Sequence, residues 1–359
     1  MSIDALSAGP PIGPMHAGPC VPSQAAAPSV TVIVPAYNAQ ATLPACLAAL
    51  GRMTYPASQI IVFSDGSTDR TPEIAAESGA QVIRNTGPSR GPGHGRNVAA
   101  RKARSDLLLF VDADVVIHAD CLEKLVAEMQ AQGAFAAFGS YDNRPGSTRV
   151  AGLYANLRHH FVHQHSAREA STFWSGVGLI ERRTFLELGG YDESLFAHPS
   201  IEDVELGMRL KHAGLRIRLV PEAQAQHRKD WTLWRVWHTD VVRRALPWSR
   251  LLVEGKSEGA DLNLSSAERI KALASAATFA SLLAAPVEPL ALLAALAFFA
   301  LYLFLNRAFI GVLARNLTTG QWLGATLLHL CYHAYSLAAF AWVAAGHGIR
   351  TAFRAGDEN

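Results

Sequence analysis

Residues 106–114 read Asp-Leu-Leu-Leu-Phe-Val-Asp-Ala-Asp, an apolar run that ends in two aspartates. A short apolar run of this kind is typical of a buried strand. In an extended chain, residues i and i+2 point to the same side, so Asp112 and Asp114 place two carboxylates together at the strand end. Two such carboxylates repel unless a cation or proton intervenes. The pair therefore predicts a site for Mg²⁺ or Mn²⁺, with a solvated loop cap as the alternative.

The chain around this stretch alternates between short β-branched or apolar runs and helical patterns. Strands are expected at 30–34, 59–63, 81–83 and 106–111, and helices at 41–51, 69–78, 95–104 and 119–132. This alternation implies right-handed β-α-β units, and hence an α/β fold with a mostly parallel sheet flanked by helices. In such sheets, ligands bind beyond the carboxyl ends of the strands.

The predicted strand ends carry polar residues. Pro35 and Tyr37 follow the first strand, and Asp65 lies in a Ser-Asp-Gly-Ser turn after the second. No Gly-x-Gly-x-x-Gly motif follows the first strand, which disfavours a Rossmann oxidoreductase. The glycine-rich segment 87–97 contains Arg96 and leads into a helix, where a phosphate would be favoured, although a surface loop explains the same segment.

The composition excludes several classes of protein. Of 359 residues, half are hydrophobic and 17% are charged, against about 25% in an average globular domain. This excludes a mostly disordered chain and a charged coiled coil. A net charge of +2 disfavours a protein that binds nucleic-acid backbones. The four cysteines have no spacing typical of a zinc site or a disulfide framework.

The charge deficit is concentrated near the C-terminus. Glu288 is the only charged residue from Ala272 to Leu305, and there is none from Asn316 to Ile349. Each stretch is longer than the roughly 20 apolar residues that cross a bilayer. We expect membrane helices within 266–349, at about 267–285, 289–305 and 321–345, with a buried helical layer of a soluble protein as the alternative.

The remaining segments complete the expected organisation. Residues 1–29 lack a secretory signal pattern and are expected to be a disordered tail, and 350–359 a short tail. The catalytic region would then face the cytoplasm from a multi-pass membrane protein. The stretch 231–265 carries four tryptophans together with arginines, which favours an amphipathic linker in the membrane interface over an RNA-binding strip.

The ordered motifs resemble those of the family 2 glycosyltransferases with the GT-A nucleotide-sugar fold. The match covers about residues 30–230, and its pieces are VTVIVPAYN, VFSDGSTDRT, GPGHGRNVAARKA, LLLFVDADV, FWSGVGLIERRTFLELGGYDE, IEDVELGMRLKHAG and His227. The resemblance implies an inverting transfer of a sugar from a nucleotide-diphosphate donor. Ser64 departs from it, because the family commonly has an aspartate there. The QxxRW motif of processive synthases is absent, which argues for single transfers.

The resemblance also implies roles for individual residues. Those that would contact the donor or the cation are Pro35, Tyr37 and Asp65 for the base and ribose, Arg96 and Asp112 for the nucleotide or diphosphate, and Asp112, Asp114 and His227 for the metal. Asp203, beside Glu202, would be the catalytic base. Gly176 is expected in the floor under the sugar or acceptor.

Structural roles compete with two of these assignments. Ser200-x-x-Asp203 is also a capping-box pattern at the start of a helix expected at 201–213. His227 follows an expected strand at 217–220 and would otherwise be a surface or second-shell histidine.

The sequence thus predicts a membrane-attached, metal-dependent glycosyltransferase whose acceptor could be lipid-linked. Two other classes stay open. One is a non-catalytic nucleotide-sugar-binding membrane scaffold, and the other is a nucleotidyltransferase on a similar α/β sheet.

Overall fold

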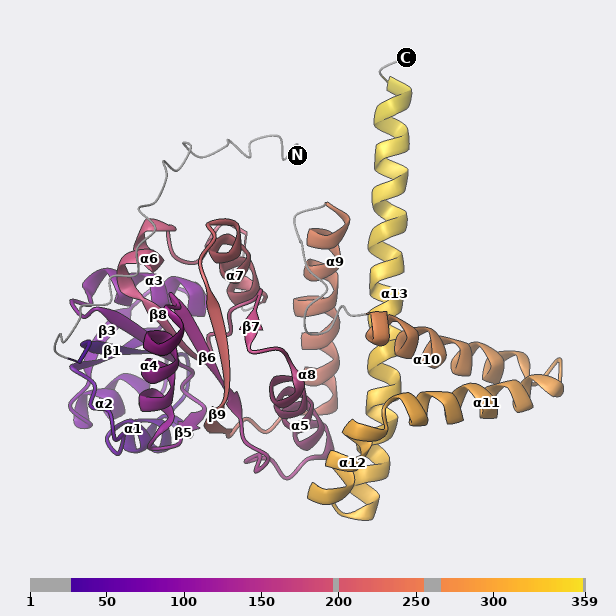
Figure 1. Ribbon diagram of the computed structural model, residues 1–359, viewed down its shortest axis with the longest axis horizontal. Helices are drawn as coiled ribbons and strands as arrows, with labels where there is room; N and C mark the ends of the chain where they lie inside the picture. Colours follow the sequence, from indigo (N-terminus) through magenta and orange to yellow (C-terminus); the bar gives the residue numbers. More distant parts are fainter. Residues whose placement is uncertain (1–26, 196–199, 255–265, 358–359) are drawn as a thin grey trace.

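The computed structural model describes residues 27–195, 200–254 and 266–357, so most of the tail expected at 1–29 lies outside the described residues. Figure 1 shows an α/β domain built on one sheet, joined to a group of helices from the C-terminal part of the chain. The helices at the junction are α5, α8 and α9.

The described residues form one nine-stranded sheet. Its strands are β1 Val30–Ala36, β2 Gln59–Asp65, β3 Gln81–Asn85, β4 Leu107–Val111, β5 Val115–Ile117, β6 Ala136–Tyr141, β7 Glu169–Ala170, β8 Val177–Glu181 and β9 Ile217–His227. Their order is β3-β2-β1-β4-β8-β6-β9-β5, and β7 pairs with β9. The four strands expected from the sequence are all present.

The sheet is mixed rather than mostly parallel. The β3-β2-β1-β4 half is parallel, as the alternation of strands and helices predicts. Beyond it, β8 runs antiparallel to both β4 and β6. Between β6 and β8 the chain passes through α5 Val150–His165, which packs on the C-terminal helices as well as on β6. It is therefore not the simple crossover helix that would return the chain parallel to its starting strand.

Helices cover both faces of the sheet. They are α1 Leu43–Leu50, α2 Thr71–Glu77 and α4 Cys121–Gln132 on one face, and α3 Pro92–Lys102, α6 Arg182–Glu187 and α7 Glu202–His212 on the other. Alternate residues of a strand point to opposite faces. Thus Val32 and Val34 pack with the first group, while Ile33 and Phe110 pack with the second. The resulting three layers fix the ends of β1, β2 and β4 along one edge.

The junction between the two parts contains α5, α8 Leu233–His238, the π-helix η1 Thr239–Ala245 and α9 Leu246–Val253. A buried ion pair holds it together: Nη1 and Nη2 of Arg158 donate to the carboxylate of Asp240 at 2.9 and 2.7 Å. The expected interfacial linker over 231–265 is thus helical through Val253, and 255–265 lies outside the described residues.

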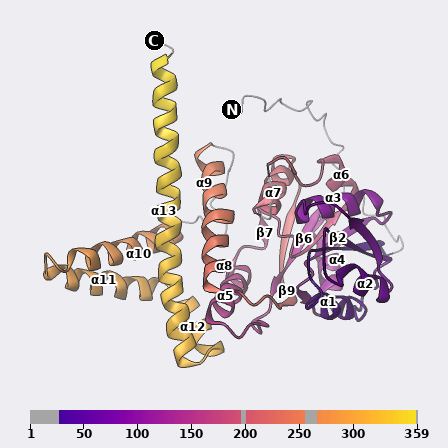
Figure 2. The same cartoon turned by 180° about the vertical axis from the view of Figure 1, so that it is seen from behind.

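The C-terminal helices are α10 Ser266–Ala284, α11 Leu290–Leu305, α12 Arg307–Asn316 and α13 Thr319–Asp357. The first two match the expected helices and form a hairpin that projects sideways, crosswise to α13 (Figures 1 and 2). The third expected helix is longer than predicted, because α13 continues through most of the expected tail at 350–359. The polar segment around Arg307 forms the amphipathic α12, which we did not predict.

The described residues contain one helix, over Thr319–His347, that is long and apolar enough to cross a bilayer. A second candidate is α11 taken together with α12, but this pair bends by 74°. The hairpin helices are individually short for the roughly 20 residues of a full span. The described helices therefore do not support the expected multi-pass arrangement.

Candidate active site

A buried arginine holds Asp112 at the end of β4. Nη2 of Arg96 donates to Oδ1 of Asp112 at 2.6 Å, and Nη1 lies 3.6 Å from Oε1 of Glu202. Arg96 comes from α3, and its guanidinium lies over the rings of Phe110 and Tyr191. Because its side chain is almost fully buried, Arg96 links Asp112 to Glu202 from within the protein.

Asp114 faces two basic groups from the end of β9. Its carboxylate oxygens lie 3.7 Å from Nε2 of His227 and 3.8 Å from Nζ of Lys229. The antiparallel pairing of Val115 with His227 brings the histidine to this place. Burial by itself would raise the pKa of Asp114, but the nearby His227 and Lys229 lower it to about 2. Asp114 is therefore ionised at neutral pH.

Asp203 lies in the first turn of α7, close to the segment that leads into β8. Its Oδ2 accepts a hydrogen bond from the backbone N–H of Ser175 at 3.3 Å, and its Oδ1 accepts from the N–H of Val204 at 2.9 Å. Burial, and then the negative charge of Glu202, raise the pKa of Asp203 to about 6. A carboxylate poised near neutral pH is suited to accept a proton.

The competing capping-box role of Asp203 is not observed. The helix is capped at Ile201 without a side-chain hydrogen bond. The hydroxyl of Ser200 instead donates to the backbone oxygen of Arg243 at 2.7 Å, which ties the start of α7 to η1. The Ser200 N–H donates to Oε2 of Glu202 at 2.7 Å. Glu202 is thus fixed by the backbone and Arg96, whereas Asp203 accepts hydrogen bonds from the N–H groups of Val204 and Ser175 and has no ion-pair partner at hydrogen-bond distance among the described residues.

Sequence reasoning missed Tyr141 and Arg244. Burial, and then the charges of Asp112 and Asp114, raise the pKa of Tyr141 well above its usual value, so this ring lies close to the aspartate pair. Nη1 of Arg244 lies 3.2 Å from Nε2 of His159, and its positive charge acts on Asp203. Arg244 comes from the π-helix, a local geometry frequent at functional sites. The tryptophan-rich pattern around it had indicated only a membrane interface.

The carboxylate of Asp65 accepts its hydrogen bonds from neighbouring groups of the protein. Its two carboxylate oxygens accept hydrogen bonds from Nδ2 of Asn85, from Oγ of Ser89, and from the N–H groups of Arg90 and Gly91. Asp65 thereby fixes the loop that precedes α3. Tyr37 is 57% exposed just beyond β1, while Pro35 is buried within it. The expected contacts of these three residues with a base and ribose stay predictions.

Gly176 lies where a side chain would not fit. A Cβ atom there would come within 2.4 Å of the Trp174 ring. The carbonyl of Gly176 accepts a hydrogen bond from the N–H of Asp112 at 3.4 Å. The glycine therefore lets the β8 segment pass close to the aspartate motif.

The structure gathers the predicted residues into two groups, one around Arg96 and one around Asp114, with Tyr141 near both aspartates. Among the described residues, no three His, Cys, Asp or Glu side chains are arranged closely enough to hold a metal ion. No hydrogen bond or ion pair among the described residues links Asp65 to Asp112 or to its partner Arg96.

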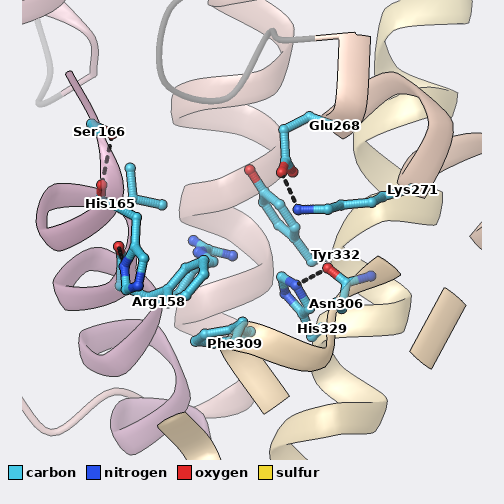
Figure 3. Close-up of a pocket in the computed structure, with 11 residues that line it drawn as sticks. Arg158, His165, Ser166, Glu268, Lys271, Asn306, Phe309, His329 and Tyr332 are labelled. Atoms are coloured by element: carbon cyan, nitrogen blue, oxygen red, sulfur yellow. Dashed lines mark hydrogen bonds and ion pairs between the residues drawn. The ribbon is translucent and has the colours of Figure 1, made fainter. Parts of the chain in front are cut away.

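A cavity of about 140 Å³ lies elsewhere, between α5 and helices α10, α12 and α13 (Figure 3). Its lining includes Arg158, Lys271, His329 and Tyr332, and none of the predicted site residues. Figure 3 shows the ammonium of Lys271 paired with Glu268. The cavity belongs to the junction between the α/β domain and the C-terminal helices.

The chain is similar in sequence to known glycosyltransferases. The profile of the family described as Glycosyl transferase family 2 matches residues 31–188. A probable glycosyltransferase of Bacillus subtilis, YdaM, is 26% identical over 240 residues, covering 62% of this chain and 55% of its own. An N-acetylglucosaminyltransferase of Sinorhizobium fredii is 32% identical over 226 residues, covering 57% and 54%. The chain thus spans about half the length of these curated relatives.

Among solved structures, the mannosyltransferase PcManGT from Pyrobaculum calidifontis, in complex with GDP-Man and Mn²⁺, superposes with a TM-score of 0.54. The superposition covers 88% of this chain and 87% of that one at 19% identity, which establishes a shared fold. The profile match, the relatives and the fold agree with the ordered motifs. Residues 31–188 therefore form a glycosyl transferase family 2 domain.

Proposed function

We propose that this protein is a membrane-attached, inverting glycosyltransferase that moves a sugar from a nucleotide-diphosphate donor to an acceptor hydroxyl. Asp203 takes the hydroxyl proton as the acceptor oxygen attacks the anomeric carbon. The bond from that carbon to the diphosphate oxygen breaks, and the diphosphate leaves with the electron pair. The carrying observation is the environment of Asp203, which raises its pKa to about 6 in the first turn of α7, beside the Arg96–Asp112 pair.

Asp114 and His227, whose carboxylate and imidazole lie 3.7 Å apart, would hold a divalent cation, Mn²⁺ or Mg²⁺, and Asp112, which pairs with Arg96 in this structure, would join them. Their donor set of two carboxylates and an imidazole, Asp112, Asp114 and His227, suits Mn²⁺. The imidazole Nε2 of His227 already faces the ionised carboxylate of Asp114. The fold relative PcManGT was solved with Mn²⁺ and GDP-Man, which supports this assignment. When bound, the cation would stabilise the charge that develops on the departing diphosphate.

Exposed apolar helices support membrane attachment. On the hairpin, Leu283, Val287 and Leu290 are 81, 90 and 69% exposed. On α8, Trp234 and Trp237 stack on one another and stay exposed, as suits a membrane interface. Because η1 contacts the start of α7 through Ser200 and Arg243, and α8 packs against η1, a lipid-linked acceptor is the substrate class that fits best. Arg269 and Lys271, at the start of α10, favour a cytoplasmic position for the α/β domain.

The pH dependence of transfer should report the ionisation of Asp203. A base must be deprotonated to accept a proton, so kcat/KM should rise with pH through about 6 and level off above it. Asp114, with a pKa of about 2, does not titrate in that range. Initial rates at saturating Mn²⁺ would measure the profile. A flat profile between about pH 5 and 7 would contradict the assignment.

Membrane attachment should depend on the exposed face of α11. Each aspartate placed in the hydrocarbon core costs about 2.5–3.5 kcal/mol. We therefore expect the double variant Leu293→Asp, Leu296→Asp to float with liposomes at least tenfold less than the wild type. Leu195→Asp, which changes an equally exposed leucine of the α/β domain, is the matched control and should float normally. Equal flotation of both variants would show that α11 does not contribute to membrane attachment.

The activity itself is tested with the full chain in detergent or liposomes. A panel of GDP- and UDP-sugars is incubated with Mn²⁺ or Mg²⁺, and release of the nucleoside diphosphate is followed. We expect turnover with at least one donor, raised by a lipid extract that supplies an acceptor. Binding of a donor without turnover would favour the non-catalytic scaffold. Release of pyrophosphate from a nucleoside triphosphate would favour the nucleotidyltransferase.

A further inference from the structure

A buried asparagine of α5 contacts the imidazole of His227. Asn156 is 2% exposed, and its Nδ2 donates to the backbone oxygen of Gly152 at 3.1 Å, one turn earlier in the helix. That bond fixes the orientation of the side-chain amide, because only the nitrogen can donate. The atom that faces His227 is therefore Oδ1, at 2.5 Å from Nδ1 of the ring.

This contact determines which ring nitrogen carries the proton. An amide oxygen only accepts hydrogen bonds, so Nδ1 of His227 must be the donor. In the neutral imidazole, Nε2 is then left with a free lone pair. Nε2 lies 3.7 Å from Oδ1 of Asp114, beyond the range of a hydrogen bond. A lone pair and a carboxylate oxygen therefore face the same space.

A second contact fixes the plane of the ring. The imidazole of His227 stacks on the phenol of Tyr141, with centroids 4.5 Å apart and planes 7° from parallel. Rotation of the ring would break both the stack and the hydrogen bond to Asn156. The ring is thus held in one orientation, and its neutral form in one tautomer, before any ligand binds.

We propose that Asn156 is a positioning residue for the divalent cation: it presents the Nε2 lone pair of His227 toward the space in front of Asp114. The inference rests on the proposed metal role of His227. Partners of this kind, which hydrogen-bond the far nitrogen of a metal-ligating histidine, raise metal affinity by about 10–100-fold. Asn156 lies far in sequence from every predicted site motif, so no sequence pattern pointed to it.

The experiment uses the full chain in detergent with two readouts. Long-range ¹H–¹⁵N spectra of ¹⁵N-histidine-labelled, metal-free protein report the tautomer, and the His227→Gln variant identifies the signals of His227. Electron paramagnetic resonance of free Mn²⁺ gives the dissociation constant. The variants are Asn156→Leu, which removes the acceptor at nearly constant shape, and Asn156→Asp, which keeps an acceptor oxygen. Gln164→Leu, which removes a hydrogen-bonded amide from the same helix, is the matched control.

We expect the Nδ1–H tautomer in the wild type and its loss in Asn156→Leu, together with about 10–100-fold weaker Mn²⁺ binding. Asn156→Asp should keep the tautomer and bind within a few-fold of the wild type, and Gln164→Leu should match the wild type. An Nε2–H tautomer in the wild type, or unchanged Mn²⁺ binding in Asn156→Leu, would overturn the positioning role alone. Failure of the wild type to bind Mn²⁺ would overturn the metal site itself.

Discussion

Replacing Asp203 with asparagine should lower kcat for sugar transfer by about 10²–10⁴-fold, the usual contribution of a positioned general base. Asparagine keeps the size of the side chain and can still accept from the N–H of Ser175, but it cannot take the acceptor proton. Donor binding should change little, because the metal ligands and Arg96 remain in place. Stopped assays of transfer and a separate titration with the nucleoside diphosphate would measure the two effects.

Glu202→Gln is the informative comparison for this variant. Glu202 accepts from the backbone N–H of Ser200 and lies 3.6 Å from Arg96, so it is held away from the role of a free base. We expect a smaller loss of kcat than in Asp203→Asn. A larger loss in Glu202→Gln would exchange the roles of the two acids. Wild-type transfer by Asp203→Asn would falsify the role of Asp203 as the base and would require another group to take the acceptor proton.

Replacing Arg158 with leucine should lower the free energy of unfolding by about 3–5 kcal/mol, because it leaves the Asp240 carboxylate buried without its cation. Both side chains of the pair are more than nine-tenths buried. Asp240 also accepts from the hydroxyl of Tyr335 on α13 at 2.8 Å, so the lost pair joins three elements of the junction. Denaturant unfolding followed by tryptophan fluorescence would measure the change.

The double variant Arg158→Leu, Asp240→Leu tests whether the loss of stability comes from leaving one charge buried without its partner. Apolar replacement of a buried ion pair is often close to neutral, so the double variant should recover much of the loss. Arg70→Leu, which breaks an exposed pair with Glu77, is the control and should unfold almost as the wild type does. A double variant less stable than either single one would show that the junction needs the charges themselves.

The parallel half of the fold was predictable because its signals are local. Strands β1, β2 and β4 contain short apolar runs, and β1, β2 and β3 are each followed directly by a helix. Local pattern and tertiary packing therefore agree in this half of the sheet. A short apolar strand was predicted at 217–220, within β9. Proline removes a ladder donor and normally interrupts a strand. The structure carries β9 through Pro221 to His227, where the pairing with β6 shifts register near Gly139 and no regular ladder bond is required.

The site was predictable only in part. Asp112, Asp114, Asp203 and His227 belong to motifs whose order along the chain is informative. Tyr141 and Arg244 act through contacts with elements far away in the sequence, and no local pattern distinguishes them from ordinary packing or interface residues. Asp65 differs from these residues. It belongs to a recognisable motif, but its carboxylate accepts hydrogen bonds from the loop that precedes α3.

The hairpin of α10 and α11 lies crosswise to the long helix α13, so the two cannot have the same orientation relative to a flat bilayer. In the membrane-attached protein that we propose, only one of them can follow the membrane normal, and the other lies in the plane of the lipid headgroups. Both are joined to the catalytic domain through α5 and the Arg158–Asp240 pair. A measured tilt of the hairpin or of α13 relative to the bilayer would therefore give the orientation of the α/β domain, and of Asp203 within it, relative to the lipid surface.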